Sequence, residues 1–196
     1  MTARWPADPS HIAQAAERLR AGAVIAFPTD TVYGVGARAM DPDAVARLYQ
    51  VKRRPTGQPM VWLVADRAQV ERFAVVSAAA NDLIARFWPG PLTLVLPARG
   101  PTTIGTIAVR AADHAVPMAL LRALSEPIAS SSANPAGQPP PVDADQVIAG
   151  LGDDLELVLD SGPSRIGEPS TILDMSGATP RILRQGAISA SELIPG

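Results

Sequence analysis

The chain has 196 residues, of which 47% are hydrophobic and 18% charged, with a formal net charge of -2 and a pI near 5.7. This length predicts one domain over residues 1–196, and the lack of cysteine excludes disulfides, thiolate metal sites and a cysteine nucleophile. The slight negative charge argues against tight non-specific nucleic-acid binding and leaves only weak RNA contact. The sequence has no apolar run of ~18 residues and no signal core, which predicts a cytoplasmic protein with no membrane span.

The first predicted elements surround a polar loop. Residues 9–21 carry apolar side chains at helical spacing, with Ser10 as a candidate N-cap and Gly22 as the stop. The short apolar run 23–27 ends at a proline and is typical of a buried strand. A second helix is predicted over 42–51, where an aspartate and a proline mark its start.

The rest of the chain mixes helices and strands irregularly. Helical periodicity marks four more segments, and short apolar runs typical of strands mark seven. The predicted helices are 66–73, 78–87, 117–124 and 143–149, and the predicted strands are 60–64, 92–96, 106–110, 127–129, 155–159, 170–173 and 181–183. Because the two types do not alternate strictly, we expect a mixed α/β (α+β) fold: a twisted open sheet of parallel and antiparallel strands with flanking helices.

The loop after the first strand, residues 28–36, gathers Thr29, an aspartate, a second threonine and a tyrosine. Two glycines within it let the backbone turn or approach another group closely. A loop of this kind at a strand end suits a small polar ligand. The alternative is an ordinary Pro-Thr-Asp-Thr turn.

Lysine occurs once in this chain. Of the 17 basic residues only Lys52 is a lysine, and it lies in the densest basic cluster, Lys52-Arg53-Arg54-Pro55. An ammonium is a compact, rotatable point charge that suits one phosphate oxygen, whereas a guanidinium is a rigid fork. These cations also follow a predicted helix C-terminus, so the alternative is a solvated group that only interacts with the helix dipole.

Familiar catalytic patterns are absent, since the sequence has no G-x-x-x-x-G-K-[ST] loop, no H-E-x-x-H and no G-x-S-x-G. Hydroxyls and cations lie instead at predicted strand ends. Such a set suits chemistry that needs positioning and charge neutralisation, such as nucleotidyl transfer. Arg110 follows one strand and can grip an amino-acid carboxylate with two parallel hydrogen bonds. Its alternative is a surface ion pair with Asp113.

Six stretches occur in a characteristic order: PTDTVYGVG (28–36), KRRP (52–55), RFWPGPLT (86–93), AVR (108–110), SSSAN (130–134) and LRQG (183–186). Together they resemble the motifs of the threonylcarbamoyl-AMP synthase family, the YrdC-like domain. The resemblance covers about residues 10 to 190. It implies an open α/β fold with a concave, positively lined cleft.

The resemblance also implies a reaction. L-threonine, bicarbonate or CO2, and ATP would condense to threonylcarbamoyl-AMP and pyrophosphate. Mg2+ would be held by the ATP phosphates and by no protein side chain. A partner transferase complex would then pass the threonylcarbamoyl group to the adenosine beside the anticodon of tRNA.

Carried over by motif, the resemblance assigns roles to individual residues. L-threonine would be held by Thr29, Arg110, Ser130 and Ser170, with Arg110 on the carboxylate. ATP would be bound by Lys52, Arg54, Thr106, Ser132, Asn134 and Arg184. Lys52 and Arg54 would meet the phosphates as the catalytic cations, and no residue would be a covalent nucleophile. Taking Lys52 as exposed, we expect Lys52→Ala to lower turnover and leave the fold intact.

Three features depart from the family's pattern. Gly167-Glu168-Pro169 precedes Ser170 where relatives often have Gly-Val-Glu, and Pro140 stands where longer relatives have a nucleotide-contacting serine. The chain also ends at Gly196 without the additional C-terminal domain of the long form, so it resembles the short single-domain form. Two alternatives stay open: a carbamoyl-adenylate-forming paralogue, and an RNA-binding module without ATP turnover.

Overall fold

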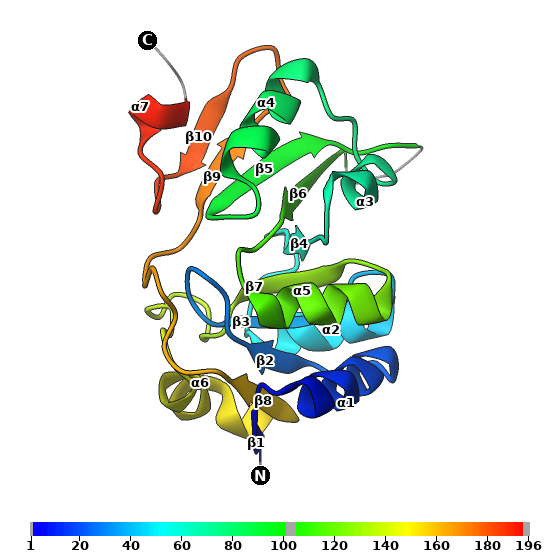
Figure 1. Cartoon of the computed structure of the whole chain (residues 1–196), viewed down its shortest axis with the longest axis vertical. Coiled ribbons are helices and arrows are strands. Elements are labelled where there is room, and N and C mark those ends of the chain that lie inside the picture. The colour runs from blue at the N-terminus through cyan, green and yellow to red at the C-terminus, as the bar shows by residue number, and fades with distance from the viewer. Residues whose placement is uncertain (1, 101–104, 194–196) are drawn as a thin grey trace.

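A ten-stranded mixed sheet organises the computed structural model, which describes residues 2–100 and 105–193 (Figure 1). The strand order is β1-β8-β2-β3-β7-β4-β6-β5-β9-β10. Four neighbouring pairs are parallel and five are antiparallel, which confirms the expected mixed sheet. The strands are β1 (Ala3–Pro6), β2 (Ile25–Phe27), β3 (Gly34–Arg38), β4 (Val61–Leu63), β5 (Leu92–Pro97), β6 (Thr106–Arg110), β7 (Ile128–Ser132), β8 (Leu157–Asp160), β9 (Thr171–Asp174) and β10 (Arg181–Arg184).

Helices flank this sheet along its length (Figure 1). They are α1 (Pro9–Arg20), α2 (Pro42–Val51), α3 (Arg67–Glu71), α4 (Ala78–Phe87), α5 (Ala115–Leu124), α6 (Ala144–Leu151) and α7 (Ala190–Leu193), with a 3-10 turn at Gly152–Asp154. Within the described ranges, none of these helices has both the length and the apolar character that crossing a bilayer requires.

Aspartates begin the two first helices. Asp41 caps α2 as the sequence predicts, accepting hydrogen bonds from Asp43 N at 3.1 Å and Ala44 N at 3.0 Å. The expected cap of α1 is wrong. Asp8 caps that helix, and the hydroxyl of Ser10 donates to the Asp8 carboxylate at 2.7 Å. The helix itself begins at Pro9, the first residue of the predicted range, because proline fits the first helical position, where no backbone N–H is needed.

The strand β3 begins inside the loop that the sequence predicted over residues 28–36. It pairs antiparallel with β2 on one side and β7 on the other. Its two glycines have a low strand propensity, but because they lack a side chain they let atoms of the neighbouring strands approach closely. A Cβ on Gly36 would lie 2.9 Å from the carbonyl oxygen of Ala129. The serines predicted to follow a short strand at 127–129 likewise belong to β7, and β1 was not predicted at all.

Three groups of buried apolar side chains hold the helices to the sheet. Leu19 of α1 and Leu120 of α5 pack with Phe27 of β2. The helices α2 and α6 pack around β3, and α4 packs around Leu94 of β5. Each fully buried leucine stabilises the fold by about 1.5–3 kcal/mol relative to exposure. These helices leave the loop between β2 and β3 free to line a pocket.

Candidate active site

One pocket brings together six of the residues predicted from the sequence. It is lined by the loop between β2 and β3, by the strands β4 to β7 and by the segments around β9 and β10. Its predicted members are Thr29, Arg110, Ser130, Ser132, Ser170 and Arg184.

The register of the central strands explains why these side chains meet. Val61 of β4 lies opposite Ser130 of β7 and opposite Ala108 of β6. Leu63, two residues further along β4, lies opposite Arg110. Residues directly opposite one another point to the same face of a sheet. The aliphatic side chains of β4 therefore line the pocket between the Ser130 hydroxyl on one side and the Arg110 guanidinium on the other.

Arg110 is buried at the end of β6, with 6% of its surface exposed. Its Nη2 donates to Asp30 Oδ1 at 2.6 Å, its Nη1 to Thr31 Oγ1 at 2.8 Å and its Nε to the carbonyl of Gly90 at 3.0 Å. Burial lowers the pKa of Arg110, and the Asp30 carboxylate opposes that shift.

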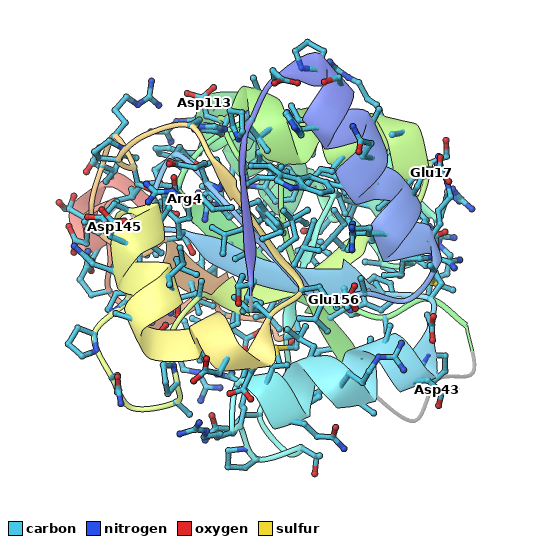
Figure 2. All side chains as sticks on the ribbon, turned by 90° about the horizontal axis from the view of Figure 1, so that it is seen from below. Arg4, Glu17, Asp43, Asp113, Asp145 and Glu156 are labelled. Atoms are coloured by element: carbon cyan, nitrogen blue, oxygen red, sulfur yellow. The ribbon has the colours of Figure 1, made fainter. Side chains whose placement is uncertain are left out.

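The alternative of a surface ion pair between Arg110 and Asp113 is therefore wrong. Asp113 lies at the periphery of the view in Figure 2, and it pairs with Arg165 at 2.6 Å. The partner of Arg110 comes instead from the loop after β2.

The hydroxyls of the pocket are held by protein partners. Thr29 Oγ1 donates to the carbonyl of Val32 at 2.6 Å and lies 3.0 Å from Thr31 Oγ1. Ser130 Oγ donates to the carbonyl of Val35 at 3.1 Å. These contacts fix the side chains before any ligand arrives, so little rotamer entropy remains to be lost on binding.

On the other side of the pocket, Arg184 and Ser170 are joined. Arg184 Nη2 donates to the Ser170 carbonyl at 2.7 Å, and Ser170 Oγ lies 2.8 Å from Thr93 Oγ1. Burial lowers the pKa of Arg184, and the positive charges of Arg110 and Arg54 lower it further. Three cations are thus close enough to repel one another, which an anionic ligand would relieve.

Lys52 is buried, with 1% of its surface exposed, at the C-terminus of α2. Its Nζ donates to the carbonyl of Ser132 and, at 2.6 Å, to that of Asn134. Burial, and then the nearby Arg54, lower the pKa of Lys52 to about 8. Both the expectation of an exposed lysine and the alternative of a solvated helix cap are wrong, because the turn after β7 covers the ammonium.

Besides Lys52, three predicted residues lie outside this pocket. Arg54 donates to the carbonyls of Gln58 and Pro59 in its own loop, at 3.0 and 3.1 Å. Asn134 lines a neighbouring cavity beside the proline-rich loop. Thr106, at the opposite end of β6 from Arg110, lines a separate, mainly apolar cavity of about 770 Å³. Their predicted contacts with a nucleotide stay predictions.

Several residues of the site were not assigned a role from the sequence. Asp30 and Thr31 contact Arg110, and Thr93 contacts Ser170. Tyr33 lines the pocket and donates from its hydroxyl to the carbonyl of Gly162 at 2.8 Å. All four lie inside stretches that carried the family resemblance, but their pairing depends on contacts between distant segments.

An electrostatic network supports the segment that Tyr33 contacts. Arg4 of β1 pairs with Asp145 of α6 and with Asp160 of β8, both at 2.7 Å, and Figure 2 shows Arg4 and Asp145 on neighbouring elements. Asp160 Oδ1 also lies 3.1 Å from the Tyr33 hydroxyl, beside the Gly162 carbonyl to which that hydroxyl donates. Burial, followed by the charge of Asp160, raises the pKa of Tyr33, so this phenol stays protonated and acts as a donor.

A protein-family model and several known proteins match this chain. The model of the Sua5/YciO/YrdC family, described as "Telomere recombination", matches residues 17–186. A putative threonylcarbamoyl-AMP synthase of Mycobacterium tuberculosis is 41% identical over 199 residues, covering 95% of this chain and 91% of the relative. The threonylcarbamoyl-AMP synthase of Bacillus subtilis is also 41% identical, but the match covers only 56% of its length, so this chain spans about half of that relative.

Solved structures match over almost the whole chain. Pyrococcus abyssi Sua5 complexed with L-threonine has a TM-score of 0.91 and 36% identity, with 100% of this chain and 60% of that chain covered. Escherichia coli YciO has a TM-score of 0.88 and 26% identity, with 99% and 100% covered.

Proposed function

Because this chain belongs to the Sua5/YciO/YrdC family, we propose that it is an L-threonylcarbamoyladenylate synthase. It condenses L-threonine, bicarbonate or CO2, and ATP into threonylcarbamoyl-AMP and pyrophosphate. The observation that carries the proposal is the buried guanidinium of Arg110 in a pocket lined by hydroxyls. A bound L-threonine in the homologous Pyrococcus abyssi protein supports the same choice of substrate.

Arg110 binds the threonine carboxylate in this proposal. A guanidinium has five N–H donors, and three of those of Arg110 have protein partners. The remaining two, one on each terminal nitrogen, are available for the two oxygens of a carboxylate. Ser130, Ser170 and Thr29 lie around the same pocket and complete the amino-acid site.

The chemistry then needs no covalent bond to the protein. The threonine nitrogen attacks the carbon of CO2 and loses a proton, which gives a carbamate. From bicarbonate the same carbamate forms when a C–O bond breaks and water leaves. A carbamate oxygen attacks the α-phosphorus of ATP, the bond to the β-phosphate oxygen breaks and pyrophosphate leaves. The protein contributes alignment of the reactants and exclusion of water from a labile product.

Cations on the nucleotide side neutralise the phosphates. Arg184 lines the pocket, and Lys52 has a third N–H donor beyond the two that bind carbonyls. Arg54, Thr106, Ser132 and Asn134 complete the proposed ATP site. Mg2+ enters in this proposal as part of the MgATP substrate, held by the phosphates.

A transferase complex consumes the product in this proposal and passes the threonylcarbamoyl group to tRNA beside the anticodon. Direct RNA contact by this chain is weak, given its net charge of -2. We place the reaction in the cytoplasm, where tRNA, ATP and threonine are all available.

Pyrophosphate release from MgATP, with bicarbonate and each common L-amino acid in turn, tests this proposal. Release that requires both bicarbonate and L-threonine is expected. Release driven by carbamoyl phosphate would favour a carbamoyl-adenylate enzyme instead. No release, together with RNA binding that persists at physiological salt, would favour an RNA-binding module.

A variant of Arg110 tests the amino-acid site. Arg110→Lys keeps the charge but loses the fork, so the KM for L-threonine is expected to rise about 10- to 100-fold. The matched control is Arg165→Lys, which changes an exposed arginine paired with Asp113. Equal KM values for both variants and the wild type would contradict the assignment of Arg110.

A further inference from the structure

A layer of three protein groups holds the guanidinium of Arg110. Asp30 accepts from Nη2, Thr31 accepts from Nη1 and the Gly90 carbonyl accepts from Nε. Each nitrogen therefore has one protein partner, and rotation about any bond of the side chain would break at least one contact. A guanidinium held at three points keeps one orientation.

The direction of the hydrogen bonds in this layer is determined. A carbonyl only accepts, so the single proton of the Thr29 hydroxyl is used on Val32 O at 2.6 Å. The contact of 3.0 Å between Thr29 Oγ1 and Thr31 Oγ1 must then be donated by Thr31. With its proton turned toward Thr29, the Thr31 oxygen presents lone pairs to Arg110.

The backbone of this layer is also fixed. Ile166 N donates to the carbonyl of Asp30 and Gly167 N donates to that of Thr31, both at 2.9 Å. Asp30 is 1% exposed and does not line the pocket, although Thr31 and Arg110 do. The carboxylate therefore lies behind the guanidinium, away from the space that a ligand would fill.

We propose that Asp30 and Thr31 are positioning residues that orient Arg110 so that its two remaining N–H groups form a preorganised fork for the amino-acid carboxylate. This inference rests on the proposed binding of L-threonine. A buried ion pair is a weak source of stability, because two desolvated charges cost about as much as their attraction returns. The ion pair of Asp30 and Arg110 can instead fix the orientation of a binding group before the ligand arrives, which apolar side chains in its place could not do.

The hydroxyl of Thr31 provides the sharpest test, because Thr31→Val keeps the shape of the side chain and removes the hydroxyl that accepts from Arg110 and donates to Thr29. We expect the KM for L-threonine to rise about 10-fold, as for one lost hydrogen bond to a charged group, with kcat within about 2-fold and the KM for ATP unchanged. Thr31→Ser restores the acceptor and is expected to return the KM for L-threonine to the wild-type value.

Asp30→Asn extends the test to the charge. Loss of the carboxylate is expected to raise the KM for L-threonine more than Thr31→Val does. The matched control is Glu126→Gln, which removes a carboxylate 2.8 Å from Arg38 on another part of the sheet and is expected to leave that KM unchanged. If Asp30→Asn does not fold, the two Thr31 variants still decide the question.

Calorimetric titration of each protein with L-threonine tests the positioning role separately from the proposed function. Binding to the wild-type chain that weakens in Thr31→Val and recovers in Thr31→Ser supports the positioning role. Equal binding by wild type and Thr31→Val would overturn that role and leave the proposed function intact. No binding to the wild-type chain would overturn both.

Discussion

Lys52→Met should change the pH dependence of stability, because it removes an ammonium that is 1% exposed while keeping a stem of similar length. The pKa of Lys52 falls from 10.5 to about 8 on folding, which costs about 3 kcal/mol at neutral pH. Its hydrogen bonds to the carbonyls of Ser132 and Asn134 return about 1.5–3 kcal/mol each. At pH 7 the substitution should therefore destabilise the fold by about 0–3 kcal/mol.

The sign of the pH dependence follows from proton binding. Between pH 8 and 10.5 the unfolded chain keeps the Lys52 proton while the folded chain has lost it, so the stability of the wild type rises with pH. Lys52→Met lacks this contribution. The difference in unfolding free energy between the two proteins should thus grow by up to about 3 kcal/mol from pH 7 to 10.5.

Urea unfolding at pH 7, 8.5 and 10, followed by tryptophan fluorescence, measures this difference. The control is Arg53→Met, which removes an exposed cation from the same loop and should show a difference that stays constant with pH. A constant difference for Lys52→Met as well would refute the lowered pKa of Lys52 in the folded chain.

Two further predictions concern activity and the C-terminal part of the site. If phosphate binding needs charged Lys52, pyrophosphate release should fall as pH rises through about 8, and Lys52→Arg should move that fall to higher pH. Gly186→Ala should lower the melting temperature and weaken ATP binding, since a Cβ there would lie 2.2 Å from the carbonyl oxygen of Pro169, next to Ser170. Gly177→Ala, with nothing within 4 Å of the new Cβ, should leave both values unchanged.

The sequence predicted the mixed sheet because short apolar runs and helical periods are local signals. It did not predict β3, since Gly34 and Gly36 have poor strand propensity and their value lies in the space they leave for β7. Nor did it predict β1, which is a strand only because it pairs with β8 from the other end of the chain.

The site shows the same division between local and distant information. Motif order was enough to select Arg110 and Ser130, which line the pocket. Sequence proximity suggested Asp113 as the partner of Arg110, but the fold brings Asp30 instead. The burial of Lys52 was equally hidden, because a lysine at a helix end is usually solvated and only the turn after β7 covers this one.

The pocket is lined by residues from Thr29 to Arg184, which has a consequence for synthesis of the protein on the ribosome. Ligands stabilise only a state that can bind them. A nascent chain that ends before Arg184 lacks part of the pocket, so ligand binding there gives it little protection against unfolding or proteolysis. Until translation passes that residue, the chain depends on the apolar packing of its helices and strands alone.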